Sequence, residues 1–183
     1  ERKDSRSQGS RAGKIAGESP MPLTDVLPRP QRQKSNRFFN RFRRSTEAKF
    51  SHGNSIALLK TGADFFGELF AAIQQAEHSV YLEFYIVRAD RTGKSLAGLL
   101  EKAAERGVEV CLLYDYMGSF DTPAAYFRKL ESCGVHCTAF NPPPFRNGIT
   151  WFDKRDHRKI AVIDSRVAFA GGLNIGDEYA GGG

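Results

Sequence analysis

Apolar residues recur with two different periods along the chain from about residue 55 onward. In "GADFFGELFAAIQQAEH", residues 62–78, they fall at helical spacing and form one stripe, made of Phe65, Phe66, Leu69, Phe70 and Ile73. In "SVYLEFYIVR", residues 79–88, they fall at every second position, which is typical of a strand with one buried face. The two periods therefore predict a helix followed directly by a strand.

The same alternation continues toward the C-terminus. Further helices are predicted at residues 92–107 and 122–134, the first ended by Gly107 and the second opened by Thr122 and Pro123. Strands are predicted at residues 55–60, 108–115, 135–140, 157–164 and 166–172, with a long loop at residues 141–156. Repeated switching between helix and strand predicts an α/β domain with a mostly parallel β-sheet flanked by helices.

Residues 1–50 follow neither period and are rich in Gly, Ser, Pro and charge. Such a composition buries too little apolar area to offset its ordering entropy, so we predict a basic, disordered arm or linker ahead of a domain at residues 51–183. The arm holds 13 Lys or Arg against 5 Asp or Glu, whereas the rest holds 14 against 16. Its last part, "NRFFNRFRRS", fits an anionic membrane surface or a solvated linker.

Several protein classes are not indicated by this composition. No apolar run approaches the roughly 20 residues that span a bilayer. Cys111, Cys133 and Cys137 do not form the pattern of a disulfide framework, and we expect reduced thiols. They also lack a zinc-like ligand spacing, so no metal site is predicted.

The candidate chemistry lies in "DHRKIAVIDSRVAFAGGLN", residues 156–174. In a strand, His157 and Lys159 project from the same face, with backbones roughly 6 to 7 Å apart. The fixed charge of Lys159 disfavours the imidazolium form, which keeps His157 available as a nucleophile or base, while Lys159 can neutralise a phosphate oxygen. Asp164 has the other parity, and we expect it to hold the turn or a basic group.

Four more residues are candidates around this pair. Gly172 removes a side chain where a ligand could approach the backbone, and the Asn174 amide can donate to a phosphate oxygen. Glu83 and Tyr85 share one face of their predicted strand, where they either line the site or form a satisfied edge. A lone His-x-Lys pair, however, also occurs on solvated strand edges.

These residues resemble a known family. "HRKIAVID" is similar to the H-x-K-x-x-x-x-D signature of the phospholipase D superfamily, and "GGLN" to its downstream G-[GS]-x-N element. With "LEFYIVRADRTG", "FNPP" and "GDEY", residues from about 55 to 180 resemble the first half of bacterial cardiolipin synthases. The resemblance implies a phospholipase D-like αβα sandwich.

The resemblance also implies an activity. Family members transfer a phosphatidyl group from a phospholipid phosphodiester to an alcohol through a covalent phosphatidyl-histidine, without a metal or other cofactor. Carried over, His157 is nucleophile or general acid, Lys159 a catalytic phosphate ligand with Asn174, and Asp164 a support. The implied partners are a phosphatidylglycerol-like phospholipid and a membrane surface rather than nucleic acid, at the cytoplasmic face of a bacterial inner membrane.

One departure leaves alternatives open. Family members use two such motifs per active site and this chain has one, so we expect a domain truncated at its C-terminus and completed by a second half, from the same longer chain or from a homodimer partner. The alternatives are a homodimeric phosphodiesterase or nuclease with one motif per chain, and a non-catalytic module that binds anionic lipid.

Overall fold

The computed structural model describes residues 53–143 and 154–181 of the 183-residue chain. The predicted arm at residues 1–50 lies outside the described residues, as does most of the predicted loop at residues 141–156. Within the described ranges, no helix combines the length and the apolar character needed to cross a bilayer.

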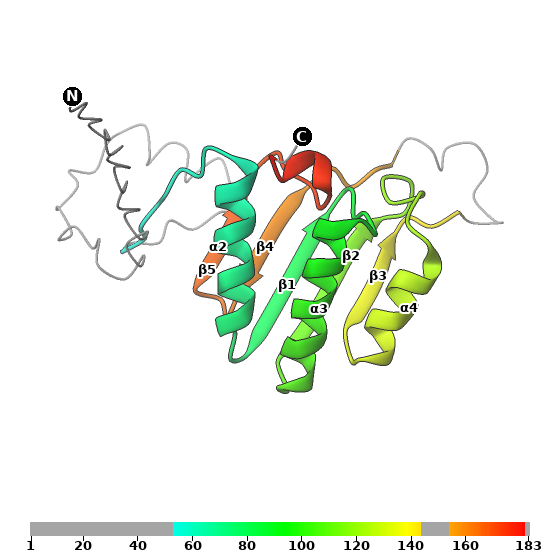
Figure 1. Ribbon diagram of the computed structural model, residues 1–183, viewed down its shortest axis with the longest axis horizontal. Coiled ribbons are helices and arrows are strands. Elements are labelled where there is room, and N and C mark those ends of the chain that lie inside the picture. Colours follow the sequence, from blue (N-terminus) through cyan, green and yellow to red (C-terminus); the bar gives the residue numbers. More distant parts are fainter. Residues whose placement is uncertain (1–52, 144–153, 182–183) are drawn as a thin grey trace, which may run out of the picture. The chain divides into compact units, whose positions relative to one another are not determined.

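Helices and strands alternate, as the two hydrophobic periods predicted (Figure 1). In chain order, the elements are α2 (Gly62–Gln75), β1 (Ser79–Phe84), α3 (Arg91–Glu105), β2 (Glu109–Asp115), α4 (Ala124–Ser132), β3 (His136–Phe140), β4 (Lys159–Ile163), β5 (Val167–Ala170) and the short 3-10 helix η3 (Asp177–Tyr179). Thr61 begins α2 with a reciprocal capping pair to Asp64, and Asp90 caps α3 through the Gly93 amide.

The strands form one sheet in the order β3-β2-β1-β4-β5. β1, β2 and β3 run parallel, whereas β4 pairs antiparallel with both β1 and β5. The α/β class is thus confirmed, with a mixed sheet: the parallel half comes from the two strand–helix–strand units, and β4 and β5 form an antiparallel hairpin because only three residues join them.

The hydrophobic core lies between the helices and one face of the sheet. The burial pattern of β1 alternates, with Val80, Leu82 and Phe84 buried and Tyr81 38% exposed. The fully buried side chains that meet them from the helices are Leu69, Ile73, Leu96, Leu100 and Leu130. In Figure 1, α2 and α3 lie in front of the strands, so the covered face is the one toward the viewer.

Two strand predictions need correction. Residues 55–60 form no strand, and Ile56 and Leu58 are 95% and 82% exposed, because no strand among the described residues supplies backbone partners for this apolar run. The strand predicted at residues 79–88 ends at Phe84, since β4 pairs with it only from Lys159 onward. His157 therefore lies just before β4 rather than within it.

Candidate active site

His157 and Lys159 come together at the start of β4. The Lys159 Nζ atom lies 3.2 Å from His157 Nδ1 and donates to the His157 carbonyl oxygen at 2.7 Å. Lys159 is only 8% exposed, and burial lowers the pKa of its ammonium group, which the Asp156 carboxylate partly offsets. The predicted pair thus exists, with an exposed imidazole beside a largely buried ammonium group.

This contact has a consequence for the proton on His157. A protonated lysine has no lone pair, so a charged Lys159 donates to Nδ1, and the imidazole proton then lies on Nε2. Nucleophilic attack by Nε2 requires the proton on Nδ1, and a general acid requires protons on both ring nitrogens. In either role Nδ1 carries a proton, so His157 has to give up the hydrogen bond that Nδ1 accepts from Lys159. An ammonium group has three N–H donors, so two engaged by His157 leave a third for a phosphate oxygen.

Tyr85 contacts both members of the pair. Its ring centroid lies 4.5 Å from that of His157 with an interplanar angle of 42°, and 5.2 Å from Lys159 Nζ. Tyr85 follows the last residue of β1, so the strict alternation of faces has ended there. Of the two residues predicted as possible site lining, Tyr85 is therefore the one that touches His157.

Glu83 has different surroundings. Its carboxylate binds Arg158 at 2.9 Å, with both side chains beside Asp156. Burial and the hydrogen bond with Asp156 raise the pKa of Glu83, and Arg158 acts in the opposite direction. In the described residues Glu83 is thus part of an ion-pair network adjacent to His157, in agreement with the alternative of a satisfied edge.

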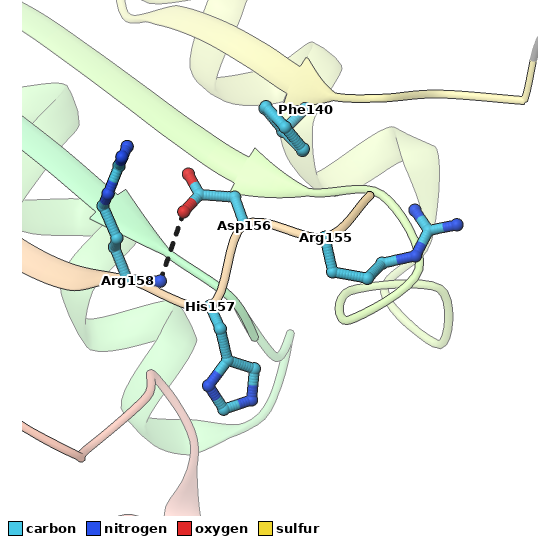
Figure 2. A pocket seen from close by; sticks show the side chains of 5 residues that line it. All are labelled: Phe140, Arg155, Asp156, His157 and Arg158. Atoms are coloured by element: carbon cyan, nitrogen blue, oxygen red, sulfur yellow. Dashed lines mark hydrogen bonds between the residues drawn. The ribbon is translucent and has the colours of Figure 1, made fainter. Parts of the chain in front are cut away.

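A hollow of about 450 Å³ opens at this place, lined by Phe140, Arg155, Asp156, His157 and Arg158 (Figure 2). The hydrogen bond drawn there runs from the Arg158 backbone N–H to the Asp156 carboxylate, at 3.2 Å. The His157 ring points away from the Asp156 carboxylate. The hollow thus flanks His157 with two arginines and one carboxylate, and both arginines lie beside acidic groups: Arg158 pairs with Glu83 at 2.9 Å and Arg155 lies 3.9 Å from Asp115.

Asp115 holds the chain just ahead of His157. It is fully buried at the end of β2, where its carboxylate accepts from the backbone N–H groups of Asp156 and Gly118, both at 2.9 Å. Asp115 is not among the site residues predicted from the sequence. A sequence signal for Asp115 was available, because an acidic last residue of a buried parallel strand lies at the carboxyl end of that strand, where ligands bind in open α/β sheets.

Asn174 and Gly172 lie in the turn region after β5. Asn174 is buried, and its amide oxygen accepts from the backbone N–H of Ile86 at 3.1 Å, which leaves the amide nitrogen as its donor group. At Gly172, an added Cβ would meet no atom within 4 Å, so the described residues leave open space there. Asn174 is thus joined to the site through Ile86, the neighbour of Tyr85.

Asp164 lies at the opposite end of β4 from His157. Its carboxylate accepts backbone N–H groups of Glu77, His78 and Ser79 at 3.0, 2.8 and 2.8 Å, and these bonds lower its pKa to about 2. Asp164 itself has a left-handed backbone with φ of 52°. The structure therefore brings His157, Lys159 and Tyr85 together and separates Asp164, which anchors the α2–β1 connection.

In the described part of the chain, no group of three or more His, Cys, Asp or Glu side chains is arranged to hold a metal ion, and the three cysteines are free. Fold and site together define an α/β domain that carries one histidine–lysine motif of the phospholipase D type. The chain belongs to the family described as cardiolipin synthase, PLD-like domain, which matches residues 69–180.

Similar proteins include several full-length cardiolipin synthases. That of Geobacillus kaustophilus is 44% identical over 134 residues, covering 72% of this chain and 26% of the relative. Cardiolipin synthase A of Pseudomonas putida is 42% identical over 134 residues, covering 70% and 27%. The chain thus spans about a quarter of their length. Among solved structures, NucT from Helicobacter pylori matches with 18% identity and a TM-score of 0.49, covering 65% of this chain and 72% of that chain.

Proposed function

We propose that this chain supplies one half of the active site of a phosphatidyltransferase that makes cardiolipin. The observation that carries the proposal is the contact between the exposed His157 ring and the buried Lys159 ammonium group, in a chain of this family. The donor would be a phosphatidylglycerol-like phospholipid and the acceptor an alcohol group. Lys159 and Asn174 would bind the phosphate oxygens.

The proposed reaction has two steps and uses two histidines, His157 and one from a second half. In the first step, an imidazole nitrogen bonds to phosphorus and the bond from phosphorus to the leaving alcohol oxygen breaks, while the other histidine gives that oxygen its proton. In the second step, the acceptor hydroxyl gives its proton to that same histidine and attacks phosphorus, and the phosphorus–nitrogen bond breaks. His157 serves as the nucleophile, in its neutral form, or as the acid, in its imidazolium form.

The test combines this chain with the C-terminal portion of the Geobacillus kaustophilus relative, in vesicles that contain phosphatidylglycerol. We expect cardiolipin to form with both parts present, and to fall by at least about 1,000-fold with His157→Ala, since the variant removes a reacting group. His136→Ala is the matched control, because His136 is an exposed histidine at the start of β3. Turnover that survives His157→Ala would overturn the mechanism.

Two other outcomes would favour the alternatives. Hydrolysis of DNA by this chain alone, without lipid turnover, would support a homodimeric nuclease. Vesicle binding without any turnover in the mixture would support a lipid-binding module. Action at a membrane surface is part of the same proposal and is tested by the same vesicle assay, and we propose the cytoplasmic face of a bacterial inner membrane as its location.

A further inference from the structure

Tyr85 occupies a position that neither the motif nor the family match assigns. Its ring contacts the two chemically important side chains at once, His157 at 4.5 Å between ring centroids and Lys159 Nζ at 5.2 Å from its own centroid. These two side chains also contact each other at 3.2 Å. The three groups therefore form a closed triangle, in which each one restricts the other two.

The Tyr85 backbone is fixed by its neighbours. On one side, a Cβ at Gly118 would overlap the Tyr85 carbonyl oxygen and lie 2.9 Å from ring atom Cδ2, so only glycine lets the β2–α4 loop approach this closely. Ser119 Oγ lies 3.4 Å from the same carbonyl oxygen and accepts from the Val87 N–H at 3.0 Å. The segment after β1 thus packs directly against the β2–α4 loop.

On the other side, the segment is bound to the chain after β5. The Asn174 amide oxygen accepts from the Ile86 N–H, and Ile175 pairs with the backbone of Ile86 and Arg88 at 3.0 and 2.9 Å. Asn174 is 4% exposed, so this contact is protected from water. The Tyr85 ring is consequently attached to a backbone that is held from two directions.

We propose that Tyr85 is a positioning residue that holds the His157 imidazole and the Lys159 ammonium group in register for phosphate transfer. An exposed imidazole loses rotamer freedom when it is ordered, and an aromatic face restricts it before the substrate binds. The Tyr85 ring also attracts the ammonium group by a cation–π interaction. The aromatic ring carries this role, so the hydroxyl group is dispensable.

Part of this inference rests on the proposed function, but its geometric core can be tested without activity. Histidine side-chain NMR signals of this chain arise from four residues, His52, His78, His136 and His157, and His157→Ala identifies the signal of interest. We expect the ring-proton shifts of His157 to change by a few tenths of a ppm or more in Tyr85→Leu, which lacks the aromatic ring current. Tyr85→Phe should preserve them.

Tyr81→Leu is the matched control, because Tyr81 lies in β1, four residues before Tyr85, and its hydroxyl donates to Glu109. Unchanged His157 signals in Tyr85→Leu, or an equal change in Tyr81→Leu, would overturn the proposal. The signals of His78 and His136, which lie among the described residues, report whether each variant is folded. A variant that unfolds is replaced by Tyr85→Met, which keeps apolar bulk without an aromatic ring.

The activity arm uses the mixture with the C-terminal half. We expect Tyr85→Leu to lower kcat by about 10- to 100-fold with KM changed less than threefold, and Tyr85→Phe to stay within about threefold of the wild type. An equally low kcat in Tyr85→Phe would contradict a role of the ring alone. If the wild-type mixture is inactive, the proposed function fails, whereas the NMR result still decides whether Tyr85 positions His157.

Discussion

At the residue scale, Asp164 shows that a residue can belong to the sequence motif without lying at the candidate active site. It is the last residue of the H-x-K-x-x-x-x-D signature, yet its carboxylate accepts three backbone N–H groups at the other end of β4. Three such bonds stabilise the charged form, which is why its pKa lies near 2. Its effect should therefore appear in folding stability rather than in proton transfer.

Asp164→Asn should destabilise the fold in a pH-dependent manner. The folded-state pKa of Asp164 is about 2, below the ordinary value of 3.8, so its carboxylate stabilises the fold above about pH 4 and loses this effect as the pH falls toward 2. Urea unfolding at pH 7 and at pH 2.5 measures the difference from wild type, which should be large at pH 7 and small at pH 2.5. A difference that stays constant between these pH values would contradict this role.

The control for that experiment is Asp121→Asn. Asp121 is exposed and pairs with Arg88 at 2.8 Å, an interaction of a type that contributes about 0 to 1 kcal/mol. Its substitution should change the free energy of unfolding little at either pH. A loss as large as that of Asp164→Asn would mean that any lost carboxylate has this effect.

Lys159 is expected to behave in the opposite way, with a small effect on folding stability and a large effect on activity. Its ammonium group is 8% exposed, and burial lowers its pKa, so the charged form is held at a desolvation cost. Lys159→Met keeps the apolar stem and removes the charge, and we expect its thermal midpoint to equal or exceed that of the wild type. Cardiolipin formation should nevertheless fall by about 100-fold or more, because a phosphate ligand is lost. A clear drop in thermal midpoint would show that the charge supports the fold.

At the element scale, the sequence predicted which face of a strand is buried better than it predicted where the strand ends. Alternation correctly placed Val80, Leu82 and Phe84 on the buried side, because burial depends on the period of the side chains. The end of β1 at Phe84 was not predictable in the same way. It depends on where β4 begins to pair with β1. It also depends on Ile175, a residue almost 90 positions away, whose backbone forms the next hydrogen bonds with Ile86 and Arg88.

The same reasoning explains which site residues were found. His157 and Lys159 could be identified from their spacing within one short segment, and Asn174 from its place after the double glycine. Tyr85 was a candidate from the face of its predicted strand, but its contact with His157 could not be predicted because the two residues are distant in sequence. Asp115 was not a candidate, and its hydrogen bond to the Asp156 N–H likewise joins two segments that are distant in sequence. The strand prediction for residues 55–60 was wrong for a related reason, since a strand requires partner strands that its own sequence does not specify.

Gly118→Ala tests how the β2–α4 loop acts on the site. A methyl group at this position would overlap the Tyr85 carbonyl oxygen and press on the ring, so the segment after β1 has to move. We expect the His157 signals to shift and kcat to fall by about 10-fold or more, with KM less affected. Gly98→Ala is the control, because an added Cβ in α3 meets nothing within 4 Å. Unchanged His157 signals in Gly118→Ala would separate the loop from the site.

At the scale of the whole molecule, the site lies at one edge of a mixed sheet. Tyr85 follows the end of β1, Asp115 ends β2, and His157 precedes antiparallel β4, so the three meet at the same edge. Helices α2, α3 and α4 contribute to the core on one face, and this scaffold holds the loops that carry the site. A rigid scaffold with its chemistry on loops would present the proposed half-site to a second half without rearranging its core.

Charge is distributed very unevenly over the chain. Residues 1–50 have a net charge of +8 and residues 51–183 one of −2. Attraction to anionic lipid is about 1 kcal/mol per basic residue near the surface and is screened within a Debye length. Membrane attraction of the chain should therefore come from the arm, particularly from Arg37, Arg41, Arg43 and Arg44, rather than from the domain that carries His157.

Replacing these four arginines by glutamine tests that assignment. We expect binding to vesicles rich in phosphatidylglycerol to weaken by about 100-fold or more at low ionic strength, with a smaller difference at 0.5 M salt because charges are then screened. The matched control replaces four basic residues of the domain, Lys94, Lys102, Arg128 and Lys129, by glutamine and should leave binding nearly unchanged. Equal losses in the two variants would mean that total charge drives binding. Unchanged binding in the arm variant would leave the domain surface as the membrane contact.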